Sequence, residues 1–315
     1  MNKITVIHHS ADFDGLFCRE IARKFLPGAE LIGWDFGQAP IPVPEAQIYI
    51  LDLPVDRVFG DAFSGQHTTK WFVPPEVLQR IVWIDHHKSS IESHPATIPG
   101  YRIDGVAACR LAWQWFTRPA IDDGASPRLP AKQEFIDRVL SEPRAVRLAG
   151  EYDVWDKRDP EAEVFQFGLR SFELSPELWA QLLRAPDDGF AEGLVGTLLN
   201  RGELLQRYQQ RADAAVMEHR SFLVEFEGLT FLALNTARCN SLTFAARDVP
   251  ATGHDALLGI CFDGSAWKFS LYHARHRTEL DLSVIATKFG GGGHRGACGF
   301  QAGTWQIAGG EMIFP

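Results

Sequence analysis

Three side chains that can bind metal ions lie close together near the start of the sequence, at His8, Asp12 and Asp14. They separate an apolar run, residues 4–7, from a segment with one apolar face that starts at Gly15, so we expect a strand, a loop and a helix. Two carboxylates two residues apart on a bending loop can serve two metal ions about 3.5 to 4 Å apart, an arrangement that holds a phosphoryl group. The structural alternative makes Asp12 or Asp14 a helix N-cap and His8 a buried histidine.

Two later segments end in side chains of the same kinds. Asp52 directly follows one apolar run, and Asp85, His86 and His87 directly follow another. Ligands in open α/β sheets collect at the carboxyl ends of the strands, so a parallel sheet would bring these side chains to the first loop. Acids and imidazoles at three strand ends predict one convergent site.

The elements that must position these side chains follow from the apolar pattern. Four short runs read as buried strands, and segments with apolar residues at helical spacing follow them. We expect an N-terminal domain with a parallel sheet and helices on both faces, at residues 1–185. The strands are expected at residues 4–7, 29–34, 46–51 and 81–84.

The second half of the chain predicts a long helix and a smaller domain. Residues 189–220 contain no proline and repeat apolar residues at helical spacing, which indicates a linker helix within residues 186–220. Paired strand patterns beyond it predict an α/β domain with a mixed sheet at residues 221–315. A short helical pattern, 281–289, leads into four glycines, His294 and Arg295. Consecutive glycines can turn backbone N–H groups toward an anion, so we expect a phosphate-binding loop there.

Composition limits the classes of partner. A length of 315 residues favours two domains, and a net charge of −9 argues against a protein that coats long duplex DNA. No apolar run approaches the roughly 20 residues that span a membrane, and no signal peptide is recognisable. Five scattered cysteines without a CxxC pair predict neither disulfides nor a zinc site, so we expect a reducing, cytoplasmic location.

The ordered motifs resemble the DHH phosphoesterase superfamily, in the nano-RNase and RecJ-like group. The resemblance rests on His8, Asp12 and Asp14, on Asp52, and on the triplet Asp85, His86, His87, in this order. The glycine stretch resembles the GGGH motif of the DHH-associated C-terminal domain. The resemblance implies a hydrolase with two metal ions, typically Mn²⁺; the mixture of carboxylates and imidazoles also suits Mn²⁺, with Mg²⁺ or Co²⁺ as alternatives.

Carried over position by position, the resemblance assigns six metal ligands. His8 and Asp12 would bind one ion, and Asp52 would bridge the two. The other ion would be bound by Asp14, His86 and Asp153, with Asp156 as the alternative to Asp153 in the family's fourth motif.

Further roles follow from the same resemblance. Asp85 would orient a histidine, and His87 would contact the phosphate as a catalytic residue. His9 is next to His8 on a strand and faces the other way. We therefore expect its side chain to pack against its neighbours or to support a metal ligand without binding the metal itself. The expected substrate-binding residues are Gly291, Gly292, Gly293, His294, Arg295 and Arg277.

The sequence departs from the resemblance before the glycines. Relatives carry an arginine in a Ser-Leu-Arg-Ser segment, whereas Tyr272 and His273 follow Ser270 and Leu271 here. Arg275 or Arg277 would replace that arginine, and Tyr272 could stack on a base. The expected activity is hydrolysis of short single-stranded oligonucleotides or small nucleotides. Pyrophosphate or polyphosphate hydrolysis and non-catalytic nucleotide binding are the alternatives, and a homodimer is left open.

Overall fold

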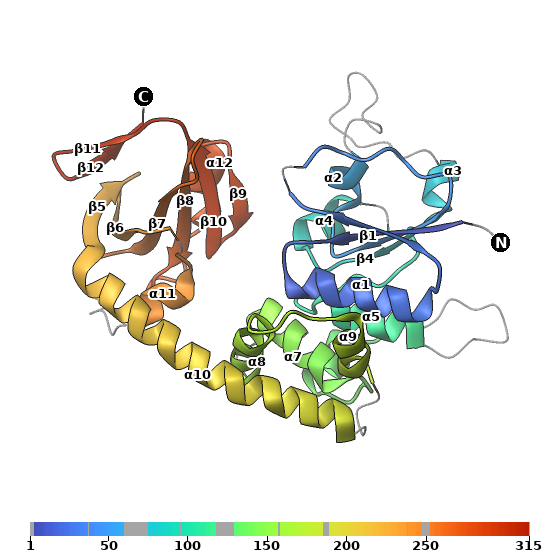
Figure 1. Ribbon diagram of the computed structural model, residues 1–315. Coiled ribbons are helices and arrows are strands. Elements are labelled where there is room, and N and C mark those ends of the chain that lie inside the picture. Colours follow the sequence, from blue (N-terminus) through green and yellow to red (C-terminus); the bar gives the residue numbers. More distant parts are fainter. Residues whose placement is uncertain are drawn as a thin grey trace. The chain divides into compact units, whose positions relative to one another are not determined.

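The chain is described from a computed structural model, and it divides into two compact units, Met1–Leu205 and Gln206–Pro315 (Figure 1). The described residues are 3–36, 38–59, 75–94, 96–117, 129–156, 158–184, 189–237, 239–246 and 253–314. The fold is α/β, with a parallel sheet in the first unit and a separate mixed sheet in the second.

The first unit contains a parallel sheet of four strands within the described residues. The strands are β1 (Ile4–His9), β2 (Glu30–Trp34), β3 (Gln47–Leu51) and β4 (Ile81–Ile84), in the order β2-β1-β3-β4. All three pairings are parallel, and His8 is in register with Gly33 and Leu51. The carboxyl ends of all four strands therefore lie at one edge of the sheet, as the sequence predicts.

Helices cover both faces of this sheet (Figure 1), which confirms the expected architecture. One face packs Val6 and Leu51 against α1 (Phe13–Phe25), α5 (Ala108–Thr117) and α7 (Arg144–Asp153). The other face packs Ile7 and Trp83 against α2 (Val55–Phe59) and α3 (Pro75–Leu78). The remaining helices of this unit are α4 (Lys88–Ser93), α6 (Lys132–Ile136), α8 (Glu161–Leu169) and α9 (Pro176–Leu182).

The expected linker is the long helix α10 (Gly189–Arg220). Its first half contributes Val195 and Leu198 to the core of the first unit, and Met217 near its end belongs to a core cluster of the second unit. The boundary between the two compact units falls inside this helix, after Leu205. None of the helices in the described parts of the chain is long and apolar enough to cross a bilayer.

The second unit is built on a mixed sheet, for which the described residues supply eight strands in the order β11-β12-β5-β6-β7-β8-β10-β9. β6 pairs with β7 in parallel and β12 with β5 in parallel, and the other pairs are antiparallel. Phe231, Phe269 and Phe300 fill its core. The elements are β5 (Ser221–Phe226), β6 (Leu229–Asn235), α11 (Ser241–Ala245), β7 (Ala256–Phe262), β8 (Trp267–His273), α12 (Ser283–Lys288), β9 (Gly292–His294), β10 (Ala297–Ala302), β11 (Gln306–Ala308) and β12 (Glu311–Ile313).

Candidate metal centre

The carboxyl end of β1 brings an imidazole between two acids. His9 Nδ1 lies 2.9 Å from Asp12 Oδ2 and 3.3 Å from Asp52 Oδ2. This nitrogen is buried, yet within the described residues it makes no hydrogen bond of normal geometry. A histidine nitrogen held between two carboxylate oxygens lies where a cation shared with those oxygens could bind.

A second group forms around His86, which follows β4. Its Nε2 lies 3.7 Å from Asp14 Oδ2, 3.4 Å from Asp153 Oδ2 and 3.3 Å from Asp52 Oδ1. Asp14 comes from the start of α1, and Asp153 ends α7. Each set, His9-Asp12-Asp52 and Asp14-His86-Asp153, has potential ligand atoms within 4.8 Å of one another.

Asp52 is the residue that both groups share, because its two carboxylate oxygens face different imidazoles. Its side chain is 2% exposed, and its amide donates to the carbonyl of Ile84 at 2.9 Å. Its φ is 60°, a left-handed conformation that Asp and Asn adopt more readily than most residues. The turn after β3 thus holds this carboxylate between the two groups.

Asp12 and Asp14 are both oriented by helix N-termini. Asp12 is the N-cap of α1 and accepts a hydrogen bond from Gly15 N at 3.0 Å, so the structural alternative holds for it alongside its contact with His9. Asp14 is buried and accepts from the amides of Ala108 and Cys109, at 2.9 and 2.7 Å, at the start of α5. These donors fix the direction of the Asp14 carboxylate toward His86.

Asp85 holds the histidine pair that follows β4. Its Oδ1 accepts from the backbone amides of His86 and His87, at 2.7 and 3.2 Å, and lies 2.6 Å from His87 Nδ1. A ligand atom of His87 also lies within 4.8 Å of ligand atoms of Asp52 and His86. The expected orienting contact of Asp85 is therefore made to His87.

The structure does not bring His8 into either group, and this revises our ligand assignment. His8 is buried, its Nδ1 donates to the carbonyl of His9 at 2.7 Å, and its ring lies beside Gly33 on β2. Strand alternation requires His8 and His9 to face opposite ways, but it does not say which one faces the site. In this structure it is His9, which the sequence analysis read as a packing or supporting residue.

Asp35 is an acid at the edge of the first group that the sequence analysis did not single out. It directly follows β2, and its Oδ1 lies 3.2 Å from His9 Nε2. Its position in the sequence could have identified it, because Asp35 directly follows an apolar run as Asp52 does. With Asp35, all four strands of the parallel sheet deliver an acid or a histidine to the same edge.

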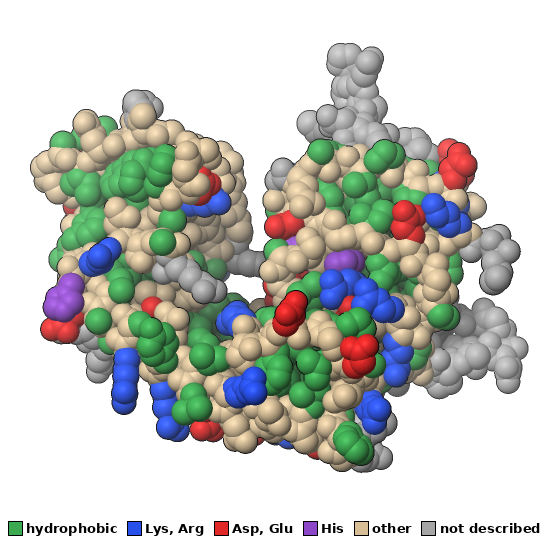
Figure 2. All heavy atoms as spheres, viewed as in Figure 1, with side chains coloured by type: hydrophobic (Ala, Val, Ile, Leu, Met, Phe, Trp, Pro, Cys, Tyr) green, Lys and Arg blue, Asp and Glu red, His purple; other side chains and the backbone are tan. Residues whose placement is uncertain are grey.

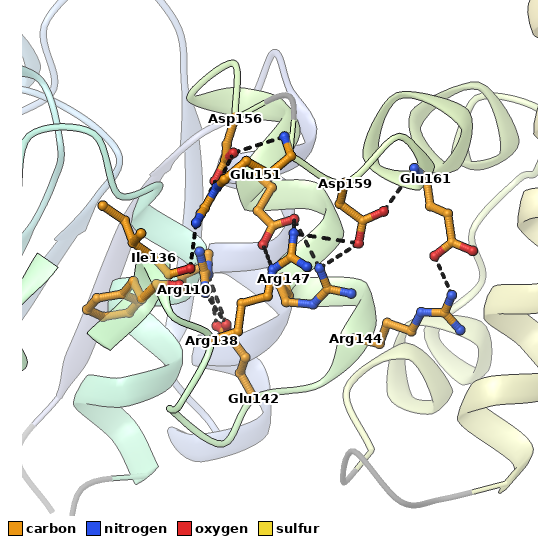
Figure 3. A network of polar contacts seen from close by, with 12 residues as sticks. Arg110, Ile136, Arg138, Glu142, Arg144, Arg147, Glu151, Asp156, Asp159 and Glu161 are labelled. Atoms are coloured by element: carbon orange, nitrogen blue, oxygen red, sulfur yellow. Dashed lines mark hydrogen bonds and ion pairs between the residues drawn. The ribbon is translucent and has the colours of Figure 1, made fainter. Parts of the chain in front are cut away.

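The neighbouring acid Asp156 is directed away from this centre. Its carboxylate pairs with Arg158, with Nε at 2.8 Å from Oδ1, whereas Asp153 lies 3.4 Å from His86 Nε2. Two residues before Asp153 on α7, the fully buried Glu151 accepts hydrogen bonds from Arg138 and Arg147, at 2.8 and 3.0 Å. Figure 3 shows the network of arginines and carboxylates around Glu151, which lies in the last turn of α7.

The electrostatics of the centre show an excess of carboxylate charge. Burial, together with the charge of Asp52, raises the pKa of Asp14 to about 7. Burial and the charge of Asp14 raise the pKa of Asp153 well above its usual range. These shifts mean that the buried carboxylates require compensating positive charge.

The imidazoles supply part of that charge when no metal is bound. Burial lowers the pKa of His9, but the contacts with Asp12 and Asp52 outweigh it and raise the pKa to about 11. For His86 the contact with Asp52 likewise outweighs burial and raises the pKa well above its usual range. Figure 2 shows histidine side chains reaching the surface of the first unit among acidic and basic ones.

The donor set fits divalent cations. Carboxylates converge with two imidazoles, and the unsatisfied nitrogen of His9 faces two acid oxygens. Mixed oxygen and imidazole donors suit Mn²⁺, Co²⁺ or Zn²⁺ better than Ca²⁺, which takes oxygen ligands.

The glycine stretch in the second unit forms a strand over part of its length. Gly292–His294 is β9 and pairs with β10, so the expected loop is replaced by an edge strand after a positive-φ turn at Gly290. A Cβ on Gly291 would lie 2.0 Å from the carbonyl oxygen of Gly299, whereas a Cβ on Gly292 would meet nothing within 4 Å. Close packing against β10 thus requires glycine at position 291.

The other residues expected to bind substrate are partly engaged in internal contacts. Arg295 is exposed and donates to the carbonyl of Glu279 at 2.7 Å. Arg277 forms ion pairs with Asp255 and Glu279. Tyr272 packs against a small apolar cluster that includes Phe244. The side chain of His294 lies outside the described residues.

Comparisons with known proteins give distant similarities. No protein-family model matches the chain. The chain is 25% identical over 235 residues to the uncharacterized protein R106 of Acanthamoeba polyphaga mimivirus. The aligned region covers 71% of this chain and 48% of that protein. The chain therefore spans about half the length of the curated relative it matches.

Three solved structures cover nearly the whole chain at low identity. A DHH domain described as a member of the s1p family of ribosomal proteins has 12% identity and a TM-score of 0.49, covering 95% of this chain and 82% of that chain. The pGpG-specific phosphodiesterase PggH from Vibrio cholerae has 15% identity and a TM-score of 0.46, covering 96% of this chain and 93% of that chain. Exonuclease RecJ bound to manganese has 16% identity and a TM-score of 0.44, covering 95% of this chain and 85% of that chain.

His9, Asp12 and Asp52 form one group, and Asp14, His86 and Asp153 form the other. In the order of its sequence motifs, the chain resembles the DHH phosphoesterase superfamily.

Proposed function

We propose that this protein is a metal-dependent phosphoesterase that hydrolyses phosphodiester or phosphomonoester bonds in short oligonucleotides or small nucleotides. One observation carries the proposal: Asp52 joins a histidine and acid group on each side of it, at the carboxyl edge of a parallel sheet. Two cation sites that share a carboxylate are suited to phosphoryl chemistry, because both ends of the displacement need charge stabilisation.

The proposed ligands follow the geometry. His9, Asp12 and Asp52 would hold one cation, and Asp14, His86 and Asp153, with Asp52, would hold the other. Mn²⁺ is the proposed ion. Two divalent cations here would polarise the phosphoryl oxygens and lower the pKa of a water molecule so that hydroxide is available near neutral pH.

The protein's own residues orient the reacting groups. Asp85 accepts from His87 Nδ1, which selects the tautomer with Nε2 free to meet the phosphoester. When His87 is protonated, it stabilises negative charge that develops on the phosphoryl oxygens. Contact with Asp85 outweighs burial and raises the pKa of His87, so the charged form persists to higher pH.

The second unit is proposed to bind the rest of the substrate. Arg295 is exposed next to the glycine stretch, and guanidinium groups suit phosphate oxygens. Gly291, Gly292, Gly293, His294 and Arg277 complete the proposed set, with Arg277 needing to exchange its carboxylate partners for a phosphate.

The activity is tested with Mn²⁺ and labelled oligonucleotides of two to five nucleotides. Release of mononucleotides by the wild type, abolished in Asp52→Asn, supports the proposal. Absence of release in both proteins contradicts it. Phosphate release from pyrophosphate or polyphosphate in the same assay identifies the alternative activity, and tight nucleotide binding without turnover identifies a binding protein.

The proposed location is the cytoplasm. All five cysteines are free in this structure, and three of them are buried as thiols in the cores of the two units. Free thiols persist in a reducing compartment. Whether the chain forms a homodimer is measured by light scattering with and without Mn²⁺.

A further inference from the structure

An aromatic ring lies exposed at the rim of the candidate metal centre. Phe36 follows β2 and is 49% exposed. Its ring centroid lies 5.7 Å from that of His9 and 6.4 Å from that of His87, at interplanar angles of 71° and 69°. Phe36 therefore borders both the first metal-binding group and the histidine proposed to meet the phosphoester.

The position of this ring is fixed by contacts on its inner side. Trp34, which is buried, contacts it edge-on at 5.7 Å between centroids. The amide of Phe36 donates to Asp35 Oδ1 at 2.7 Å, and that same oxygen contacts His9. The amide of Asp35 donates to Gln38 Oε1 at 3.2 Å. These contacts hold the Phe36 ring in place and leave about half of the residue exposed to solvent.

An exposed phenyl ring contributes nothing to phosphate or metal binding, because it has no donor, acceptor or charge. It offers flat apolar area, and a nucleobase offers a matching flat surface whatever its sequence. Inorganic pyrophosphate and polyphosphate have no such surface. A ring held beside the proposed cleavage site therefore favours a substrate that carries bases.

We infer that Phe36 is the stacking platform for a nucleobase next to the scissile phosphoester, and so a specificity-determining residue for nucleotides over inorganic phosphates. The inference rests on the proposed function of the same centre. It assigns the first unit a direct contact with the base. The alternative is a purely structural ring that shields His9 and His87 from water.

The test compares a dinucleotide with its abasic analogue, which has the same sugars and phosphodiester but no bases. Phe36→Leu keeps apolar volume and removes the ring, while Phe36→Trp keeps an aromatic face. We expect Phe36→Leu to lower the ratio of the two kcat/KM values, dinucleotide over abasic, by roughly 5- to 100-fold. Phe36→Trp should retain the ratio.

Phe190→Leu serves as the matched control, because Phe190 is an exposed phenylalanine of the same unit whose ring lies near Arg184. It should leave the ratio as in the wild type. A Phe36→Leu protein that loses activity equally on both substrates overturns the inference and identifies the ring as structural. Circular dichroism and thermal unfolding establish that each variant is folded.

A binding measurement separates failure of this inference from failure of the proposed activity. Stacking quenches the fluorescence of a dinucleotide that contains 2-aminopurine. If the wild type hydrolyses neither substrate, the proposed activity fails, but quenching by wild type and Phe36→Trp and not by Phe36→Leu still supports the stacking role. Equal quenching by all three proteins, or none by any, overturns it.

Discussion

His9 reaches across the edge of the sheet to Asp52, with its Nδ1 at 3.3 Å from the carboxylate Oδ2. Asp52 meets His86 with its other oxygen. A single side chain thus links imidazoles that come from the first and the fourth strands.

The ligand role of His9 is tested against that of His8. We expect His9→Ala to weaken Mn²⁺ binding by about 100-fold or more, because even residues that only support a metal ligand cost 10- to 100-fold when removed. His8→Asn removes an imidazole that lies beside β2 and should change Mn²⁺ affinity much less. Isothermal titration with Mn²⁺ measures both. A larger loss in His8→Asn than in His9→Ala would restore the assignment made from the sequence.

Asp52→Asn isolates the charge of the shared carboxylate from its backbone conformation. Asn adopts the left-handed conformation at φ 60° at least as readily as Asp, so the turn after β3 should persist. We expect kcat to fall by roughly 100- to 1,000-fold or more, because a preorganised charge at the centre is lost. Asp52→Val should in addition lower the unfolding temperature, since a β-branched residue is strained at this φ. Retained turnover in Asp52→Asn would show that the two groups act without a shared ligand.

Mn²⁺ binding should release protons near neutral pH. In the metal-free protein the pKa of His9 is raised to about 11 and that of Asp14 to about 7, so both carry protons that ligation must displace. Affinity for Mn²⁺ should therefore rise with pH between about 6 and 8. Calorimetry in buffers of different ionisation enthalpy counts the released protons. A count of zero would mean that the protonated residues are not the ligands.

The same shifts set how metal-free stability depends on pH. Asp14 has a folded-state pKa above its ordinary value of 3.8, so the folded state binds more protons between about pH 4 and 7 and loses stability as pH rises through that window. The contribution of His9 is present below pH 6.5 and is lost as pH rises toward 11. Excess Mn²⁺, at 100 times its dissociation constant, should add about 2.7 kcal/mol at neutral pH. Thermal unfolding at several pH values, with Mn²⁺ or with a chelator, checks the direction of each predicted change in stability.

Glu151→Gln tests the network in Figure 3 behind Asp153. Glu151 is fully buried between Arg138 and Arg147, and removing one partner of a buried ion pair costs about 3 to 5 kcal/mol; partial exposure of the arginines reduces this figure. We expect a loss of about 2 kcal/mol and weaker Mn²⁺ binding, because the turn that carries Asp153 loosens. Glu161→Gln, in a solvent-exposed pair with Arg144, should cost less than about 1 kcal/mol and leave metal affinity alone. Equal effects of the two changes would contradict a positioning role.

Neighbouring glycines of the second unit provide a matched pair. Gly291→Ala would place a Cβ against the carbonyl of Gly299 and should destabilise the second unit by about 1 to 3 kcal/mol, whereas Gly292→Ala has free space. Denaturant unfolding measures the difference. Nucleotide affinity should fall in Gly291→Ala if the β9 edge contacts substrate, and an unchanged affinity would remove this edge from the proposed binding surface.

The arrangement of strands was predictable because buried parallel strands are continuous apolar runs, and each run here ends in a recognisable polar residue. Asp14, Asp52 and His86 could be placed at one edge from this pattern alone. The choice between His8 and His9 could not, because a period of two assigns opposite faces without naming the inward one. Which of the two histidines faces the site depends on the direction in which the loop leaves β1, and that direction is set by the tertiary structure.

Two other details also depended on side-chain and strand pairings that the apolar pattern does not reveal. Helical spacing offers both Asp153 and Asp156 to the centre, and only the pairing of Asp156 with Arg158 separates them. Gly292 to His294 read as a loop because four glycines have low strand propensity. Pairing with β10 overrides that preference.

The contact of Asp14 with the first amides of α5 also has a consequence for biosynthesis. The carboxylate and its two donors are 94 and 95 positions apart, so this ligand cannot be locked in place until the ribosome has released the chain past Cys109. Asp153 arrives later still. A nascent polypeptide shorter than the first unit would therefore lack part of the proposed centre, and metal loading at that centre would be a late event that reports completion of this unit.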